Sequence, residues 1–385
     1  MDFDQVVPRH GTNSVKHDGR AAYFGTADVL PLWVADMDFA SPEAVTRALQ
    51  ERAAHPVYGY TLYPESAYEA LIAWLKKRHG WEVQREWIIM APGVVPSLFA
   101  SVMAFAQEGD GVIVQPPVYF PFFSAVTTNH RRLIENPLRL IGDRYEIDFK
   151  HFEQCAAEGA RLMLFCSPHN PVGRVWSKKE LTELLSIARR YDITILADEI
   201  HADLVYPGER HIALATLAKE TDKVITTVAP SKTFNIPGLG LSCVIAPNAV
   251  HRHAIQQVFD TLHVSNTNPF SIAAFEAAYR GGEVWLDSLL AYLLGNRDFV
   301  HDYVAQHLPV IKIIHAEGTY LLWLDCRSLG FSDVKLRDFF VREARVGMNP
   351  GAVFGKNGSG FMRLNIASPR HVIADALGRI REALS

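Results

Sequence analysis

The chain has 385 residues, and its 38 basic against 42 acidic side chains leave a formal net charge of −4. That length is typical of two or three domains, and a hydrophobic fraction of 49% is ordinary for a globular protein. A nearly neutral charge balance carries no electrostatic signature of binding to nucleic acid or to an anionic membrane surface. We therefore expect neither kind of partner.

Processing and metal signals are also missing from the sequence. The N-terminus is acidic and is broken by Pro8 and Gly11, so it does not resemble a secretory signal. The four cysteines are sparse and form no CxxC pair, which indicates a reducing compartment, and we expect a cytoplasmic protein. The sixteen histidines form no HExxH motif, so we expect no metal site.

The predicted elements begin with two amphipathic helices, at about Glu43–Ala54 and Ser66–His79. Short, apolar, β-branched runs then alternate with helical patterns. We predict strands at Val112–Val114, Leu162–Cys166, Ile193–Ala197, Val224–Val228 and Cys243–Ala246. This alternation predicts a mostly parallel sheet with helices on both faces.

One predicted helix has a clear start signal. Ser177 and Glu180 form a capping box ahead of the apolar positions of Leu181–Tyr191. Beyond about Trp285 the pattern changes to that of a smaller α+β unit. We predict a long helix, two strands, a helix and a third strand there, at Trp285–His307, Val310–Ile314, Tyr320–Leu324, Val334–Glu343 and Phe361–Ile366.

Three polar side chains follow three successive predicted strands. Asn170, Asp198 and Lys232 come after the second, third and fourth strands in that order. Ligands of an open parallel sheet bind beyond the carboxyl ends of its strands, so we expect these side chains to share one crevice. A desolvated lysine can form a Schiff base, a buried carboxylate can keep a pyridine nitrogen protonated, and an amide can hold a phenolic oxygen. Together these are the requirements of pyridoxal phosphate chemistry.

The same cofactor needs a site for its phosphate. Gly93 permits a close backbone approach, and Pro96 suits the first turn of a helix that would point free N–H groups at an anion. Tyr119, after the first strand, is the candidate to cover the ring. Each feature alone has an ordinary structural interpretation, as a surface charge, a turn or a packing residue. Their joint order and strand-end placement favour a cofactor site.

Longer motifs around these residues resemble the fold-type I pyridoxal-phosphate enzymes of the class I and II aminotransferase superfamily. They are Pro168-His-Asn-Pro-Val-Gly173, Ala197-Asp-Glu-Ile-His201, Ser231-Lys-Thr-Phe-Asn235 and Phe361-Met-Arg-Leu-Asn365. Further segments resemble the MalY/PatB branch, the cystathionine β-lyases and related carbon–sulfur lyases: 32–39, 58–60, 93–96, 199–203 and 231–238. The resemblance runs from about Phe3 to the C-terminus. It implies an α/β fold with a large cofactor domain at 46–284 and a small α+β domain made of 1–45 and 285–385.

The resemblance also implies roles around the cofactor ring. Lys232 holds pyridoxal 5′-phosphate as a Schiff base and later moves protons. Asp198 pairs with the pyridine nitrogen and Asn170 with the ring oxygen. Tyr119 lies against the ring, and His201 lies in the same pocket.

The remaining implied roles concern the phosphate and the substrate. Val94 and Val95 give backbone N–H groups to the phosphate, and Tyr60 reaches the phosphate of a neighbouring subunit, which requires a homodimer. Arg363 binds the α-carboxylate of a small amino-acid substrate. Ala35 lies in a segment that touches the substrate, and Tyr119 and Asn170 also contact it.

Two positions depart from the aminotransferase pattern. Most members carry a tyrosine three residues after the ring aspartate, where this chain has His201, as in the lyase branch. Most also carry a phosphate-binding arginine eight residues after the lysine, where this chain has Gly240, and a serine three before the lysine is replaced by Ala229. The phosphate site has therefore lost a charge and a hydroxyl, which Ser231 and Tyr60 are expected to replace.

The resemblance implies β-elimination from cystathionine or another S-substituted cysteine, giving a thiol, pyruvate and ammonia. An aminotransferase acting on a small or aromatic amino acid is the alternative, because the same residues serve both reactions. A third hypothesis is a cofactor-binding regulator without useful turnover, although no basic DNA-binding domain precedes the first core helix. A nicotinamide dehydrogenase is disfavoured because no GxGxxG lies between a strand and a helix.

Overall fold

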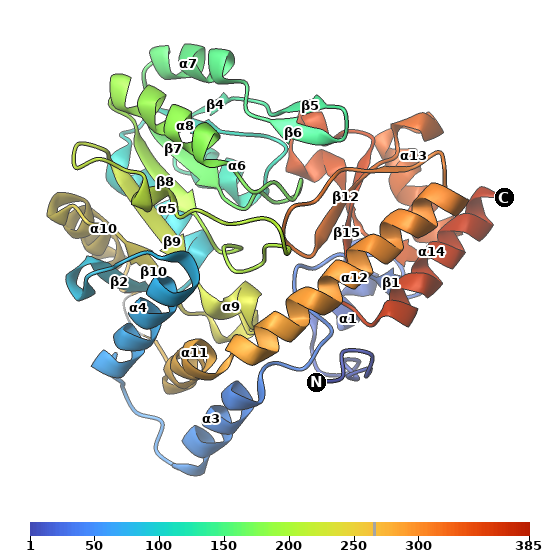
Figure 1. Cartoon of the computed structure of the whole chain (residues 1–385), viewed down its shortest axis with the longest axis horizontal. Helices are drawn as coiled ribbons and strands as arrows, with labels where there is room; N and C mark the ends of the chain where they lie inside the picture. Colours follow the sequence, from blue (N-terminus) through green and yellow to red (C-terminus); the bar gives the residue numbers. More distant parts are fainter. Residues whose placement is uncertain (265–266) are drawn as a thin grey trace.

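The computed structural model describes residues 1–264 and 267–385 (Figure 1). A seven-stranded sheet in the order β2-β10-β9-β8-β7-β3-β4 forms the larger unit. Its strands are β2 Ile88–Ala91, β3 Gly111–Val114, β4 Arg132–Glu135, β7 Ala160–Cys166, β8 Thr194–Asp198, β9 Val224–Val228 and β10 Ser242–Ile245. Five adjacent strands, from β4 to β9, run parallel, and β10 pairs antiparallel with both β9 and β2. The predicted mostly parallel sheet is confirmed.

Alternation along the strands explains why both faces of this sheet are covered. Val112 and Val114 join the cluster under α5, α6 and α10, while Ile113 between them joins the cluster under α7 and α8. Successive side chains of a strand point to opposite faces, so a continuous apolar run needs helices on each side. The helices of the larger unit are α3 Glu43–Ala54, α4 Glu65–His79, α5 Val94–Phe105, α6 Pro121–Thr127, α7 Phe149–Ala157, α8 Lys178–Arg190, α9 Pro230–Thr233, α10 Ala249–Thr261 and α11 Pro269–Gly281.

Local signals place several helix ends where the sequence predicts them. The predicted helix at 43–54 matches α3 at both ends. The capping box is present at the start of α8, with Ser177 accepting from the Glu180 N–H and the Glu180 side chain accepting from the Ser177 N–H. The buried positions of α8 include Leu181, Leu184 and Leu185, which pack on the sheet. These matches arise because caps and periodicity are local properties of the chain.

The smaller unit is built on an antiparallel sheet in the order β11-β12-β15-β14. Its strands are β11 Lys312–Ile313, β12 Leu321–Asp325, β14 Asn349–Pro350 and β15 Phe361–Asn365. Its helices are α1 Val15–Asp18, α2 Arg20–Phe24, α12 Glu283–His307, α13 Asp333–Asp338 and α14 Arg370–Leu384. The predicted helix at 334–343 is split, because a π-helical turn, η5 Phe339–Glu343, follows α13.

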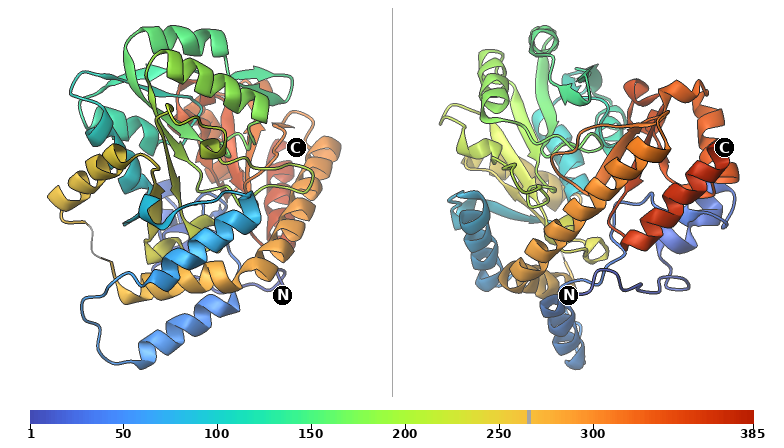
Figure 2. Two further views of the ribbon diagram at one scale, coloured as in Figure 1. Left: turned by 60° about the vertical axis from the view of Figure 1, so that its left-hand side comes forward. Right: turned by 45° about the vertical axis from the view of Figure 1, so that its right-hand side comes forward.

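Both ends of the chain contribute to the smaller unit. β1 (Leu30–Pro31) pairs in parallel with β13 (Val346–Gly347), and the long helix α12 crosses from α11 to the small sheet (Figures 1 and 2). We propose the two-unit division with boundaries at 45/46 and 284/285, which fall within α3 and the first turn of α12.

The remaining elements are short. A hairpin joins β5 Arg139–Ile141 to β6 Arg144–Glu146. Single 3₁₀ turns occur at η1 Arg85–Trp87, η2 Leu214–Thr216, η3 Pro237–Leu239, η4 Arg327–Leu329, η6 Gly351–Phe354 and η7 Lys356–Gly358. Among the described residues, no helix combines the length and the apolar character that a membrane span requires.

Candidate active site

A cavity of about 170 Å³ lies beyond the carboxyl ends of the central strands. Strand register explains its position, because Asp198 at the end of β8 stands opposite Cys166 on β7 and Thr227 on β9. Loops leaving these three strands therefore converge at one edge of the sheet. The cavity is lined by Ala35, Val94, Val95, Tyr119, Cys166, Asn170, Asp198, Ile200, His201, Ser231 and Lys232.

The Lys232 amine is buried at one wall of this cavity. Its Nζ donates a hydrogen bond to the carbonyl oxygen of Ala35 at 2.6 Å. Burial, and secondarily the charge of Arg363, lower the pKa of Lys232 to about 8, against the opposing effect of Asp36 and Asp198. A lowered pKa leaves an appreciable fraction of the amine neutral near pH 8, which is the form that attacks a carbonyl carbon.

Asp198 faces the same cavity from the end of β8. Its Oδ1 accepts a hydrogen bond from the Ile200 N–H at 3.1 Å, and the side chain forms no ion pair among the described residues. Burial, aided by the neighbouring charge of Glu199, raises the pKa of Asp198 to about 7. A ligand that presents an N–H to a buried carboxyl without a cation stabilises the ionised form of that carboxyl. Such a ligand therefore suits Asp198.

Arg363, on β15, lies behind Asn170 rather than on the cavity wall. Its Nη1 donates to the Asn170 Oδ1 at 3.0 Å, and its Nη2 donates to the Asn349 Oδ1 at 2.7 Å and the Trp33 carbonyl at 3.0 Å. The guanidinium also lies 4.8 Å from the centre of the Phe354 ring. These contacts fix the plane of a guanidinium that comes from the smaller unit.

The charge of Arg363 has no compensation within the described part of the chain. The side chain is 3% exposed, no carboxylate lies within ion-pair distance of it there, and its Nε has no hydrogen-bond partner. Burial lowers the pKa of Arg363 to about 10. Because an isolated buried cation is costly, this arrangement indicates an anionic ligand next to Asn170.

The opposite end of the cavity is the start of α5. Val94 and Val95 are the first residues of this twelve-residue helix, and Gly93 before them provides no side-chain cap. The first N–H groups of a helix lack intrahelical acceptors and carry partial positive charge, so they suit a phosphate. Ser231, in the first turn of α9, also lines this cavity.

Tyr60 is the one predicted site residue that the structure leaves far from these groups. It is fully exposed, at 104% of the reference value, on the loop between α3 and α4 that projects from the body (Figure 1). The same loop exposes Val57, Tyr58 and Leu62. Within one chain, Tyr60 has no role in the cavity.

His201 lies inside the cavity and keeps an unpartnered ring nitrogen. Its Nδ1 is buried and has no hydrogen-bond partner within the described residues, and its ring lies edge-on to Tyr320 at 6.2 Å. Burial, together with the charges of Lys232 and Arg363, lowers the pKa of His201 to about 3. The imidazole is therefore neutral at ordinary pH and offers a polar atom to a bound ligand.

Sequence reasoning missed several residues that shape the site. Cys166 and Ile200 line the cavity, Asn349 orients Arg363, and the Tyr320 hydroxyl donates to the Ala35 carbonyl at 2.9 Å. Cys166 is close in sequence to Asn170, and Ile200 is close in sequence to Asp198, so their positions on the cavity wall follow from those neighbours. Asn349 and Tyr320 act across long sequence separations and carry no local signal.

A wider opening of about 820 Å³ adjoins the cavity at Ala35 and Lys232. Three charged residues on its wall are paired: Arg9 contacts Asp36 at 2.6 Å and Asp38 at 2.8 Å. Asp38 also contacts the fully buried Lys16 at 2.7 Å. This network fixes the segment that presents the Ala35 carbonyl to Lys232.

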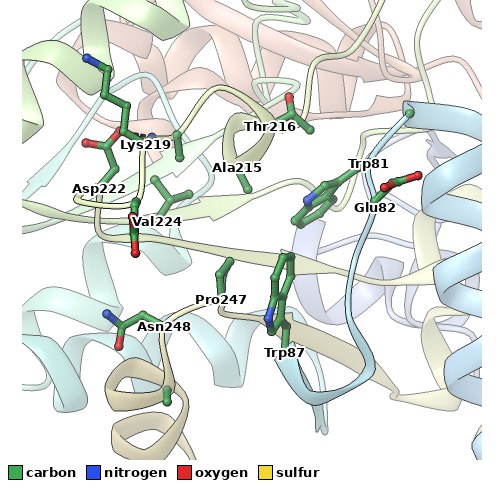
Figure 3. A pocket seen from close by; sticks show the side chains of 14 residues that line it. Trp81, Glu82, Trp87, Ala215, Thr216, Lys219, Asp222, Val224, Pro247 and Asn248 are labelled. Carbon is green, nitrogen blue, oxygen red and sulfur yellow. Dashed lines mark hydrogen bonds between the residues drawn. The ribbon is translucent and has the colours of Figure 1, made fainter.

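A separate depression of about 750 Å³ lies around Trp81, Trp87 and Pro247 (Figure 3). Lys219 and Asp222 also border it, but none of the predicted site residues does. The described residues contain no group of three or more side chains placed to bind a metal ion.

The residues of the smaller cavity fit pyridoxal phosphate. They offer a lysine amine, a buried carboxyl without a cation, an orphaned histidine nitrogen and a free helix N-terminus around one enclosed volume. Each of these groups can bind one part of the cofactor. In the same order, those parts are the aldehyde, the pyridine nitrogen, the ring oxygen and the phosphate. Asp198, Asn170, Tyr119, Ser231 and Lys232 would hold the group.

Known proteins resemble this chain over its whole length. A family model described as aminotransferase class I and II matches residues 27–380. Cystathionine beta-lyase PatB of Bacillus subtilis is 40% identical, with 100% of each protein covered. A PLP-bound putative aminotransferase from Clostridium difficile is 39% identical with a TM-score of 0.98 and full coverage of both chains. Cystalysin from Treponema denticola, which contains a pyridoxal 5′-phosphate cofactor, is 37% identical with a TM-score of 0.96, covering 100% of this chain and 98% of that one.

Proposed function

The chain belongs to the class I and II aminotransferase family, within the branch of the cystathionine β-lyases, and we propose that it is a pyridoxal-phosphate-dependent carbon–sulfur lyase. Its substrates are cystathionine or other S-substituted cysteines, and its products are a thiol, pyruvate and ammonia. The observation that carries this proposal is the convergence of Lys232, Asp198 and Asn170 on one cavity with Arg363 behind it.

Arg363 is the proposed anchor of the substrate. Two of its nitrogens are held by Asn170, Asn349 and the Trp33 carbonyl, so the guanidinium has a fixed orientation before the substrate arrives. An α-carboxylate supplies the missing anion and forms a bidentate, charge-assisted pair. Anchoring the carboxylate next to Asn170 places the substrate's Cα toward Lys232.

Lys232 is the proposed proton carrier. Pyridoxal phosphate, when bound, supplies an electron sink that stabilises negative charge at the substrate's Cα. The Lys232 amine, with its pKa lowered by burial, would take the proton from Cα. The Cβ–S bond would then break with the electron pair leaving on sulfur, and the sulfur would take up a proton to give the thiol. Asp198 favours the protonated pyridine nitrogen by its charge. The enamine product then takes up water and yields pyruvate and ammonia.

The aminotransferase alternative uses the same residues but needs a keto-acid acceptor. The test is to incubate the purified, cofactor-loaded protein with cystathionine and no keto acid, and to measure pyruvate and free thiol. We expect both products in equal amounts, and neither from Lys232→Ala, which lacks the amine. Absence of both from the wild-type protein, together with half-transamination by an ordinary amino acid, would establish the alternative.

A homodimer with shared active sites is part of the proposal. The exposed apolar and aromatic side chains of the loop between α3 and α4 are of the kind that contact another protein. Tyr60 of the partner subunit would complete the phosphate end of the cavity. The compartment we propose is the cytoplasm, in keeping with four buried, unpaired cysteines.

A further inference from the structure

A buried hydrogen-bonded cluster lies behind the helix that carries Lys232. Its centre is Asp203, whose side chain is 8% exposed. The Asp203 Oδ1 accepts from the Trp74 Nε1 at 3.0 Å and pairs with the His79 Nε2 at 2.8 Å. Its Oδ2 accepts from the Thr233 hydroxyl at 2.8 Å. Three elements therefore meet at one carboxylate: α4, the loop after β8, and α9.

The contact with Thr233 fixes the position of a very short helix. α9 has only four residues, and Lys232 directly precedes Thr233. A helix of one turn has few internal hydrogen bonds, so its orientation depends on contacts with its surroundings. The Thr233 hydroxyl ties it to the loop that follows Asp198 and carries His201. The position of the Lys232 amine relative to Asp198 therefore depends on this hydrogen bond.

His79 and Trp74 hold the carboxylate on its other side. An ionised carboxylate only accepts hydrogen bonds, so the His79 Nε2 carries the shared proton. Burial opposes ionisation of Asp203, but His79, Thr233 and Trp74 lower its pKa below the ordinary value. The His79 ring lies edge-on to His211 at 5.4 Å, and the His211 Nε2 lies 3.0 Å from the Oε2 of Glu199, the neighbour of Asp198. The same loop is thus held at two points.

We propose that Asp203 is a positioning residue for Lys232, acting through Thr233 and held in turn by His79 and Trp74. The inference rests on the proposed role of Lys232 in proton transfer. Neither Asp203 nor Thr233 lines the cavity, so the effect passes through the orientation of α9. A small displacement of a reacting group lowers the rate of the chemical step more than it weakens substrate binding.

The decisive variant is Thr233→Val, which keeps the shape of the side chain and removes its hydroxyl. Thr233→Ser restores the hydroxyl. Thr226→Val is the matched control, because the Thr226 hydroxyl is equally buried, on β9, but has no hydrogen-bond partner within the described residues. For cystathionine cleavage, we expect Thr233→Val to lower kcat about tenfold with KM changed less than about twofold. Thr233→Ser should recover most of the loss, and Thr226→Val should behave as wild type.

A spectroscopic measurement separates positioning from turnover. The visible absorbance of bound pyridoxal phosphate changes with pH and reports the surroundings of Lys232. We expect its midpoint to shift by about half a unit or more in Thr233→Val and to stay unchanged in Thr226→Val. If Thr233→Val does not fold, Asp203→Asn, which has the same shape but one acceptor oxygen fewer, should show the same fall in kcat and the same shifted midpoint.

Two results would overturn the inference. One is a Thr233→Val protein whose kcat and absorbance midpoint both match those of Thr226→Val. The other is an equal loss of kcat in Thr233→Ser and Thr233→Val, because restoring the hydroxyl would then not restore the position of Lys232. A wild-type protein that forms no pyruvate from cystathionine contradicts the proposed function instead, and the absorbance comparison still decides the role of Asp203.

Discussion

The two ends of the cofactor cavity differ in how completely one chain builds them. At the carboxylate and ring end, Asn170, Asp198 and Arg363 are buried, and each is fixed by hydrogen bonds within the chain. At the end where we propose that the phosphate binds, called the phosphate end, the chain supplies the N-terminus of α5 and Ser231. Position 240, where the resemblance to aminotransferases leads us to expect an arginine, is a glycine, and Tyr60 is fully exposed to solvent.

This difference indicates where preorganisation is needed. Charge that develops at Cα is stabilised only by groups already in place, so the ring end has to be rigid. The phosphate does not react, and we propose that backbone N–H groups, with a contact from a second subunit, bind it. Changes at the ring end should therefore affect chemistry, and changes at the phosphate end should affect cofactor binding.

Asp198→Asn should give the largest effect at the ring end. The amide cannot offset the charge of a protonated ring nitrogen, and we expect kcat for β-elimination to fall about a thousandfold with the cofactor still bound. Steady-state kinetics with cystathionine, together with cofactor absorbance, measure both quantities. Asp192→Asn is the control, because Asp192 is an exposed residue whose side chain pairs with Lys223. A loss of cofactor instead of a loss of kcat would contradict the proposed division between the two ends.

The pKa of Asp198 also gives a pH dependence to the stability of the cofactor-free protein. Burial raises this pKa from its ordinary value of 3.8 to about 7, so between these pH values the folded state holds a proton that the unfolded state has lost. This contribution to the free energy of unfolding is present below about pH 4 and is lost as the pH rises toward about 7. Urea unfolding at several pH values should show that slope in the wild type and a shallower one in Asp198→Asn. Equal slopes would contradict the raised pKa.

Arg363→Lys tests the anchor at the same end. A lysine keeps the charge but loses the planar fork held by Asn170 and Asn349, and charge-assisted hydrogen bonds contribute about 1.5–3 kcal/mol each. We expect kcat/KM to fall about a hundredfold, mainly through KM. Arg327→Lys is the matched control, because Arg327 pairs with Asp325 near the surface, with its own side chain 56% exposed. If both substitutions have the same small effect, Arg363 is not the carboxylate anchor.

The ring end is also the part that the sequence predicts best. Asn170, Asp198 and Lys232 each follow a strand with a strong local signal, and parallel register then brings them together. The partners that fix them were not predictable from local patterns. Asn349 contacts Arg363 from another strand, and Tyr320 reaches the Ala35 carbonyl from far along the chain. Such contacts depend on tertiary packing, which periodicity and capping signals do not encode.

The phosphate end shows more clearly which features of the site cannot be predicted from the sequence. The sequence predicts the N-terminal residues of α5 as phosphate ligands, and the structure places them on the cavity wall. The role of Tyr60 stays a prediction, because it depends on a second subunit. The positioning of Lys232 through Asp203 likewise has no local signal, since His79 and Thr233 are far apart in sequence.

Tyr60→Phe should have a moderate effect confined to the phosphate end. Removing one phosphate hydrogen bond should weaken cofactor binding about tenfold and leave kcat of the fully loaded enzyme within about twofold. Cofactor titration followed by absorbance measures the first quantity. Tyr58→Phe is the control, because its hydroxyl bonds the Ala53 carbonyl of its own chain.

Mixing two defective proteins tests whether that tyrosine acts across subunits. In a heterodimer of Tyr60→Ala and Lys232→Ala chains, one of the two sites receives both native residues. At a cofactor concentration too low to load Tyr60→Ala, we expect the mixture, after subunit exchange, to be more active than either parent. If the mixture gains no activity while the parents exchange subunits, Tyr60 does not complete a shared site.

The smallest expected effect concerns Gly240, at the position where the resemblance to aminotransferases leads us to expect an arginine. Gly240 has φ +43°, in the left-handed region, and a Cβ there would lie 3.6 Å from the Pro92 carbonyl oxygen. The left-handed conformation costs a non-glycine residue about 1–2 kcal/mol of conformational free energy. Gly240→Ala should therefore lower the free energy of unfolding by about 1 kcal/mol. Gly238→Ala is the matched control, because a Cβ at Gly238 meets open space and its φ is not positive. Urea unfolding of both variants measures the difference. If Gly240→Ala is as stable as Gly238→Ala, the left-handed backbone conformation does not explain why this position holds a glycine instead of the expected arginine.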